Sequence, residues 1–173
     1  MSLSMYQASV PLFVQILTAL WKVLDKAEAH AAAKKIDPAV LLGCRLAPDM
    51  YPLSRQIQTV SDMAKGASAR LAGVEVPSWP DNENTFLGLK DRIRKTLDFV
   101  QSFEPAQIDG SEEREVAMKI GGNPVTFKGQ PYLLHFVFPN FYFHAAAAYA
   151  ILRHNGVELG KRDFMGRVPG LSA

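Results

Sequence analysis

Apolar residues recur at three- and four-residue spacing in four long stretches of this 173-residue chain, and this periodicity most limits how it can fold. The stretches cover residues 4–35, 48–71, 85–103 and 130–155. Such spacing places the apolar side chains on one face of an α-helix. Four helices of this kind can bury those faces only against one another. The pattern therefore predicts a mainly all-α chain that folds as a four-helix bundle.

Residues that favour helix ends stand at the borders of these stretches. Ser4 can cap the first helix, and Asn84 or Thr85 can cap the third. Asp37 followed by proline is typical of the start of a further short helix. Gly73 is placed to end the second long helix, because glycine accepts the left-handed conformation found at helix C-termini.

The stretch REVAMKIGGNPVTFKG, residues 114–129, changes to a two-residue period. Apolar residues alternate with polar ones on both sides of GGNP, which is typical of a turn. The sequence therefore predicts a small β-hairpin inserted between the third and fourth helices. Pro139 interrupts the fourth helical stretch, either as a kink or as a break between two segments.

No internal repeat or linker divides the chain, so we expect a single domain over residues 1–173. Residues 160–173 contain Gly and Pro and few core residues. We expect them to form a loose C-terminal extension.

The composition excludes several classes of protein. The net charge is +2 with scattered basic residues, so we expect no nucleic-acid partner. The N-terminus lacks a signal peptide, and charges interrupt the apolar stretches before about 18 residues, so we expect no membrane partner. The single cysteine, Cys44, rules out an internal disulfide and fits a small buried residue. These features predict a soluble, cytoplasmic protein.

The stretch at residues 139–160 contains the best candidate for chemistry, His144. Asn140 lies four residues earlier and projects from the same helix face, with Tyr142 beside them. The pair can coordinate a metal or bind a ligand, or His144 can be a packed, hydrogen-bonded core residue. The sequence has no Glu-x-x-His pair, no phosphate-binding glycine loop and no Ser or Cys nucleophile motif.

Three charged residues near the start of the second helix are further candidates. Asp49 is expected in the first turn, where it caps the helix or offers a carboxylate at the mouth of the bundle. Arg45 and Arg55 flank it and can bind an anion or pair with acidic residues.

Residues 5–31, 46–56 and 141–166 (MYQASVPLFVQILTALWKVLDKAEAHA, LAPDMYPLSRQ and FYFHAAAAYAILRHNGVELGKRDFMG) together resemble an uncharacterised family similar to the DinB/YfiT-like superfamily of metalloenzymes. The resemblance implies a four-helix bundle, often a homodimer, with one divalent metal on three histidines. One histidine comes from the second helix and two come from the last helix, four residues apart.

Several positions depart from that pattern. By resemblance His144 takes the place of the last histidine, and Asn140 stands where the other is expected. The second-helix histidine has no counterpart, and the nearest polar residue is Asp49. An amide oxygen is a weak ligand for zinc or nickel. The resemblance therefore implies a degraded site that binds a divalent metal weakly, takes an organic ligand, or is structural.

Two functions follow from this comparison. The first is a small-molecule-binding or stress-associated protein without catalysis. The alternative is a divalent-metal-dependent hydrolase or a thiol-dependent transferase, in which His144 is the main ligand beside Asn140 and Asp49. A homodimer is expected from the superfamily, with exposed aromatic residues such as Phe138, Phe141 and Trp79 at its interface.

Overall fold

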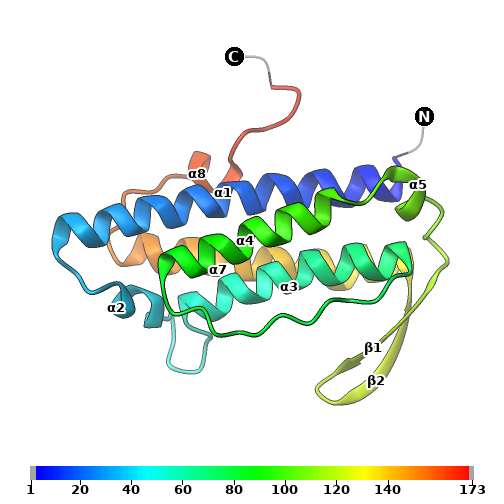
Figure 1. The fold of residues 1–173 in the computed structure, drawn as a ribbon, viewed down its shortest axis with the longest axis horizontal. Coiled ribbons are helices and arrows are strands. Elements are labelled where there is room, and N and C mark those ends of the chain that lie inside the picture. Colours follow the sequence, from blue (N-terminus) through cyan, green and yellow to red (C-terminus); the bar gives the residue numbers. More distant parts are fainter. Residues whose placement is uncertain (1–2, 172–173) are drawn as a thin grey trace.

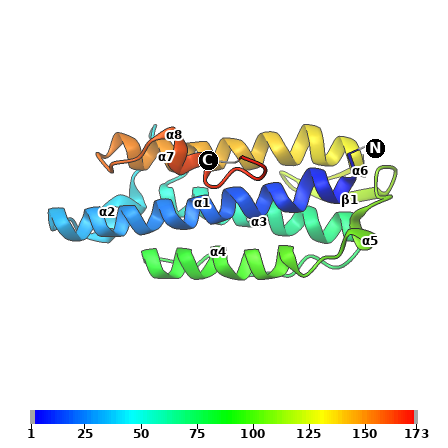
Figure 2. The same cartoon turned by 90° about the horizontal axis from the view of Figure 1, so that it is seen from above.

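The computed structural model describes residues 3–171 and confirms the predicted four-helix bundle (Figure 1). Its four long helices run along the longest axis of the molecule. They are α1 (Met5–Lys34), α3 (Leu53–Ala72), α4 (Phe86–Gln101) and α7 (Phe138–His154). Helix α3 packs against both α7 and α4, and α1 packs against α4. In Figure 2, α7 and α4 lie on opposite sides, with α1 and α3 between them.

Shorter elements connect and flank the bundle. The helical ones are α2 (Pro38–Gly43), α5 (Pro105–Ile108), α6 (Gly129–Pro131), the π-helical segment η1 (Tyr132–Val137) and α8 (Lys161–Met165). Strands β1 (Glu115–Ile120) and β2 (Asn123–Lys128) pair antiparallel, with Val116 opposite Phe127. The predicted hairpin is thereby confirmed, and Figure 1 shows it projecting from one end of the bundle.

The predicted helix ends are confirmed where a side chain or a glycine determines them. The Ser4 hydroxyl accepts the backbone N–H of Gln7, while the Gln7 side chain accepts that of Ser4. Thr85 caps α4 through the N–H of Gly88. Gly73 ends α3 with φ of 72°, the left-handed conformation that glycine adopts without strain.

The second long helix begins later than predicted, which corrects the place of Asp49. Helix α3 starts at Leu53, and its N-cap residue, Pro52, offers no side-chain hydrogen bond. Proline disfavours helical geometry in the residue before it, so Tyr51 stays outside the helix, which does not reach Asp49. Asp49 lies instead in an exposed turn and caps nothing.

Helices α3 and α4 run in the same direction, so the chain must return along the bundle between them. Residues 74–85 make this crossover, which Figure 1 shows running nearly the length of α3. Bundles with such long connections are a known variant of the four-helix architecture. Because the crossover has no regular structure of its own, its position depends on side-chain contacts.

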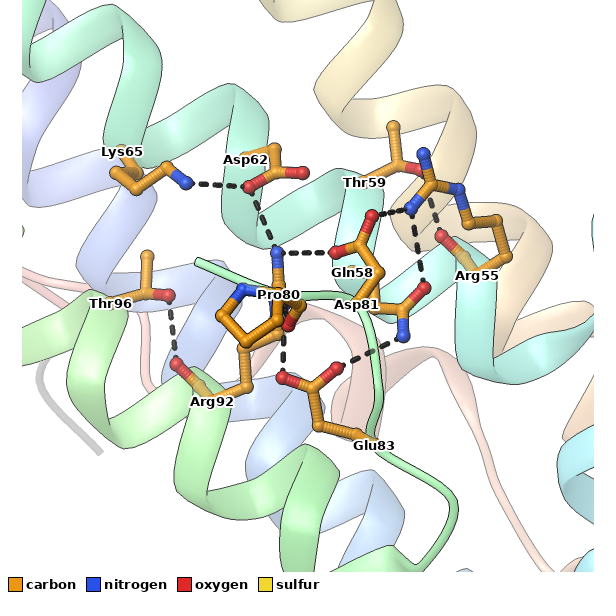
Figure 3. Close-up of polar contacts among 10 residues, drawn as sticks. All are labelled: Arg55, Gln58, Thr59, Asp62, Lys65, Pro80, Asp81, Glu83, Arg92 and Thr96. Carbon is orange, nitrogen blue, oxygen red and sulfur yellow. Dashed lines mark hydrogen bonds and ion pairs between the residues drawn. The ribbon is translucent and has the colours of Figure 1, made fainter. Parts of the chain in front are cut away.

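A buried arginine supplies those contacts (Figure 3). The Arg92 side chain on α4 is 1% exposed, and its Nη2 atom lies 2.9 Å from carboxylate oxygens of both Asp62 and Asp81. Its Nη1 atom lies 3.0 Å from Glu83 Oε1 and donates to the Pro80 carbonyl at 3.1 Å. The guanidinium thus joins α3, α4 and the crossover, as its planar fork of donors allows.

Two further cations balance the three carboxylates around Arg92. Lys65 pairs with Asp62 at 2.8 Å, and Arg55 pairs with Asp81. The Lys65 and Lys95 ammonium groups each lie 4.4 Å from the centre of the Trp79 ring, which fixes the crossover by cation–π contacts. The network is therefore neutral overall, which favours the burial of the Arg92 and Lys65 side chains.

Pro139 does not break the last helix, because the turn before it widens. Segment η1 precedes α7 without a gap, and the N–H of Phe138 reaches back five residues to the Leu133 carbonyl. Proline inside an α-helix lacks one N–H and clashes with the carbonyl four residues earlier. A π-helical turn displaces that carbonyl, so the helix continues through Pro139.

Residues 160–166 are packed against the bundle, which corrects the expectation that residues 160–173 form a loose extension. Helix α8 docks on α1, where Lys26 Nζ lies 2.7 Å from Asp163 Oδ1. Gln15 Nε2 donates to the Met165 carbonyl at 2.8 Å, and the Phe164 ring packs edge-on against Tyr149. The sequence prediction failed because polar contacts rather than a long apolar stripe hold this segment.

Two other expectations change with the burial of α1 and α7. Phe141 is fully buried and packs edge-on against Phe13, so it cannot form an exposed interface.

By length and composition α1 could cross a membrane, contrary to the argument from interrupting charges. However, half of its most apolar window is buried inside the bundle, as in a core helix.

Gly129→Ala should destabilise the fold. A Cβ atom at Gly129 would collide with the backbone carbonyl oxygen of Ser111, which cannot move as a flexible side chain could. We expect a loss of about 1–3 kcal/mol in the free energy of unfolding, measured by urea denaturation. The control is Gly43→Ala, where nothing lies within 4 Å of the added atom and a change within about 0.5 kcal/mol is expected. Equal losses in both variants would contradict the packing argument.

Arg92→Met should destabilise the fold more strongly. The substitution leaves Asp62, Asp81 and Glu83 without their shared cation, at an expected cost of about 3–5 kcal/mol in thermal or urea unfolding. Arg94→Gln removes an arginine from the same helix whose side chain is 67% exposed, and should change stability by less than about 1 kcal/mol. A small effect of Arg92→Met would show that other contacts hold the crossover.

Candidate functional site

His144 on α7 and Gln56 on α3 meet across the interface of these two helices. His144 Nδ1 lies 2.7 Å from Gln56 Oε1. The Gln56 residue is 1% exposed, and its Nε2 atom donates to the Tyr51 carbonyl at 3.0 Å. A buried amide with both ends bonded has a fixed orientation, so Gln56 holds the imidazole in one place.

This arrangement determines which imidazole nitrogen carries the proton. The Gln56 amide nitrogen faces the Tyr51 carbonyl, so the amide oxygen faces His144. An oxygen accepts, and His144 Nδ1 must therefore carry the hydrogen. In the neutral ring Nε2 is then left as an acceptor with a free lone pair. Within residues 3–171, no other hydrogen bond involves the His144 ring.

Aromatic rings and one cation surround the His144 ring. The Tyr51 ring is stacked on it at 6.0 Å between centroids, and the Phe143 ring meets it edge-on at 5.2 Å. Tyr51 is 50% exposed and Phe143 56% exposed, so both rings also face solvent. Burial lowers the pKa of His144, and the positive charge of Arg55 lowers it further. The imidazole is therefore neutral at neutral pH.

Asn140 lies one turn before His144, as predicted from their spacing, but part of its side chain is already occupied. Its Nδ2 atom donates to the Phe136 carbonyl at 2.6 Å, within the same helical stretch. Its amide oxygen is the one atom left that could coordinate a metal, and one N–H of Nδ2 is left as a donor.

The other predicted residues are divided between this cluster and the neighbouring loop. Arg55 lies 5.7 Å from the centre of the Tyr51 ring and is paired with Asp81, which is one of the two roles expected for it. Arg45 donates to the carbonyls of Pro48 and Met50 at 3.3 and 3.1 Å and holds the turn that contains Asp49.

Tyr142 is not directed toward His144. It packs against the rings of Phe138 and Phe141, at 6.3 and 5.6 Å between centroids. Burial there raises the pKa of its hydroxyl. Residues two apart on a helix point in nearly opposite directions, so Tyr142 faces away from His144 although it is close to it in the sequence.

These donors do not fit the three-histidine metal centre that the resemblance implies. Among residues 3–171, no group of three His, Cys, Asp or Glu side chains could hold a metal ion. The α3 side chain at the site, Gln56, uses its oxygen to bind His144, and an amide nitrogen does not coordinate zinc. One imidazole and the oxygen of Asn140 remain, which is too few ligands for a closed zinc or nickel site.

Gln56 is the residue that the sequence analysis missed. It lies three residues after Leu53 and four before Val60, both of which are buried on the core face of α3. A polar residue at a core position was therefore the available signal.

The described chain also has clefts apart from this cluster. One of about 770 Å³ lies between α1, the end of α7 and α8, and is lined by Lys26, His30 and Arg153 among others. A second, of about 330 Å³, lies between α1 and residues 166–169. Neither is lined by His144.

Comparison with known proteins agrees with this architecture. Residues 5–165 match the family model described as a domain of unknown function, DUF1993. The crystal structure of a DinB family member from Shewanella denitrificans is 37% identical, with a TM-score of 0.86, and the match covers 97% of this chain and 95% of that one. No curated protein matches the chain. The chain therefore belongs to the DUF1993 family, an uncharacterised family with the DinB-like bundle fold.

Proposed function

We propose that this protein binds a small organic molecule at His144, in place of the divalent metal implied by its resemblance to metal-binding relatives. The observation that carries the proposal is the bond between His144 Nδ1 and Gln56 Oε1 at 2.7 Å. It holds a neutral imidazole whose Nε2 lone pair can accept a hydrogen bond.

Gln56 supports this proposal by its place in the bundle. It lies on the helix that provides one histidine ligand in the superfamily, and it contacts His144 on the last helix. A histidine there could share a metal with His144, whereas the amide accepts the imidazole N–H instead. Gln56 and His144 thus form a neutral hydrogen-bonded pair instead of a pair of metal ligands.

The surroundings of His144 indicate the chemistry of the ligand. A hydroxyl, amine or amide N–H is the group that Nε2 accepts, and the half-exposed rings of Tyr51 and Phe143 favour a flat apolar body. The nearby guanidinium of Arg55 is already paired with Asp81. We therefore expect an uncharged aromatic ligand with one donor group.

The metal-dependent hydrolase or thiol-dependent transferase is the second candidate, and one feature favours it. Histidines that bind metals commonly donate their other ring N–H to an oxygen, as His144 Nδ1 does to Gln56. The small number of remaining donors counts against it, so metal content separates the two functions.

Untagged protein should contain no stoichiometric zinc or nickel by elemental analysis, and neither metal should raise its melting temperature. Too few strong ligands surround His144 to hold either ion. The double variant Gln56→His, Asn140→His places three histidines at this site and should gain a metal-dependent rise in melting temperature. One equivalent of metal in the wild-type protein, lost in His144→Ala, would contradict the proposal and favour the enzyme.

Phenol and benzamide serve as probes for the organic ligand. In a ¹H–¹⁵N titration, both should shift the resonances of His144 and Gln56 in the wild type and have no such effect in His144→Ala. His154→Ala removes an exposed histidine from the same helix and is the matched control. Shifts that persist in His144→Ala would place the binding elsewhere.

Stability should depend on pH through His144. Its pKa in the folded state is lowered from the ordinary value of 6.5, so the unfolded chain binds this proton more readily. The free energy of unfolding should therefore fall as the pH is lowered from about 6.5 toward the folded-state pKa. His144→Gln should remove this component from urea melts, whereas His154→Gln should retain it. An unchanged slope in His144→Gln would assign the dependence to other groups.

A further inference from the structure

Helix α1 carries mainly uncharged residues on its outer side, and Val14 at the border of this side also packs against the core. Its core face includes Val10, Phe13 and Leu17, which are buried. Pro11, Val14 and Thr18 follow the same three- and four-residue spacing on the outer side; Pro11 and Thr18 are exposed and Val14 is half-buried. A helix on the outside of a bundle ordinarily carries charged or polar residues there.

The C-terminal segment turns this face into a groove. After the bond between Gln15 and the Met165 carbonyl, Gly166 approaches α1 so closely that a side chain there would come within 3.0 Å of the Ala19 Cβ atom. Gly166 has φ of 63°, which redirects the chain, and residues up to Pro169 form the opposite wall. The groove measures about 330 Å³, at the lower end of the size range of small-molecule sites.

The charges at this groove are of one sign. Lys22 and Arg167 are among its lining residues, which include no Asp or Glu. Within residues 3–171, neither cation forms an ion pair, whereas Lys26, one turn beyond Lys22, is paired with Asp163. Two unneutralised cations beside an apolar trough complement a molecule with an apolar body and one negative end.

We propose that this groove binds a free medium-chain carboxylate. The hydrocarbon lies against Val14, Thr18 and Ala19, and the carboxylate is held by Lys22 and Arg167. Apolar contact stabilises the bound hydrocarbon, and the two cations make the groove prefer a carboxylate to an uncharged ligand. The site is separate from the His144 cluster and does not depend on its function.

Octanoate is the probe, and octanamide is its uncharged counterpart. In a ¹H–¹⁵N titration of the full chain, octanoate should shift the amides of Val14, Gln15, Thr18 and Gly166. Octanamide should bind roughly tenfold more weakly, because it lacks the charge-assisted bonds. Octanoate shifts at His144 instead of the groove, or equal affinity for both probes, would overturn the proposal.

Variants test the two parts of the site separately. The double variant Lys22→Gln, Arg167→Gln should weaken octanoate roughly tenfold or more and leave octanamide unchanged. Val14→Trp should fill the trough and abolish binding of both probes. Lys119→Gln, which removes a cation from the hairpin, is the matched control and should bind octanoate like the wild type.

Light scattering distinguishes a ligand groove from an interface between two copies. A homodimer stays a prediction for this chain of 19.1 kDa. Octanoate binding with an unchanged molecular mass supports the ligand site. Dissociation of a dimer by Val14→Trp, without octanoate binding in the wild type, would show that a second copy occupies the groove and would overturn the proposal.

Discussion

The proline inside the last helix determines how α7 meets the rest of the bundle. Leu133, Val137, Phe141 and Ala145 are all fully buried and follow one another at four-residue steps. In a regular α-helix each such step turns about 40° past a full turn, so three steps would carry the apolar face away from the core. The wide turn at Tyr132–Val137 absorbs this drift at the place where Pro139 requires it. The helix then continues with His144 directed at α3.

The polar cluster at His144 and the ion network at Arg92 are linked through one side chain. Arg55 pairs with Asp81, which also binds Arg92, and the Arg55 guanidinium lies over the Tyr51 ring that stacks on His144. The same charge lowers the pKa of His144. The crossover between α3 and α4 therefore contributes to the electrostatics of the site. The hydrogen bond observed at the imidazole comes from Gln56 on α3 and not from the crossover.

The sequence predicts the bundle well because periodicity and caps are local properties. Ser4, Thr85 and Gly73 each act on a helix end within a few residues of themselves. The predictions failed where distant residues decide. Asp49 was assigned to a helix that Pro52 delays, and α8 is held to α1 by Lys26 and Gln15, far away in the sequence. No pattern within either segment reports those partners.

The candidate site also combines residues that the sequence predicts with one that it does not. A motif search finds reactive residue types such as histidine, and it does not find the distant residue that positions them. His144 and Asn140 were found from their spacing on one helix, but the residue that fixes the imidazole is a glutamine on another helix. Gln56 has no charge and belongs to no metal motif, so only its place between Leu53 and Val60 marked it. A buried amide costs free energy unless both of its ends are bonded. A polar residue at a core position therefore implies a partner across the interface, and in this bundle that partner is the histidine.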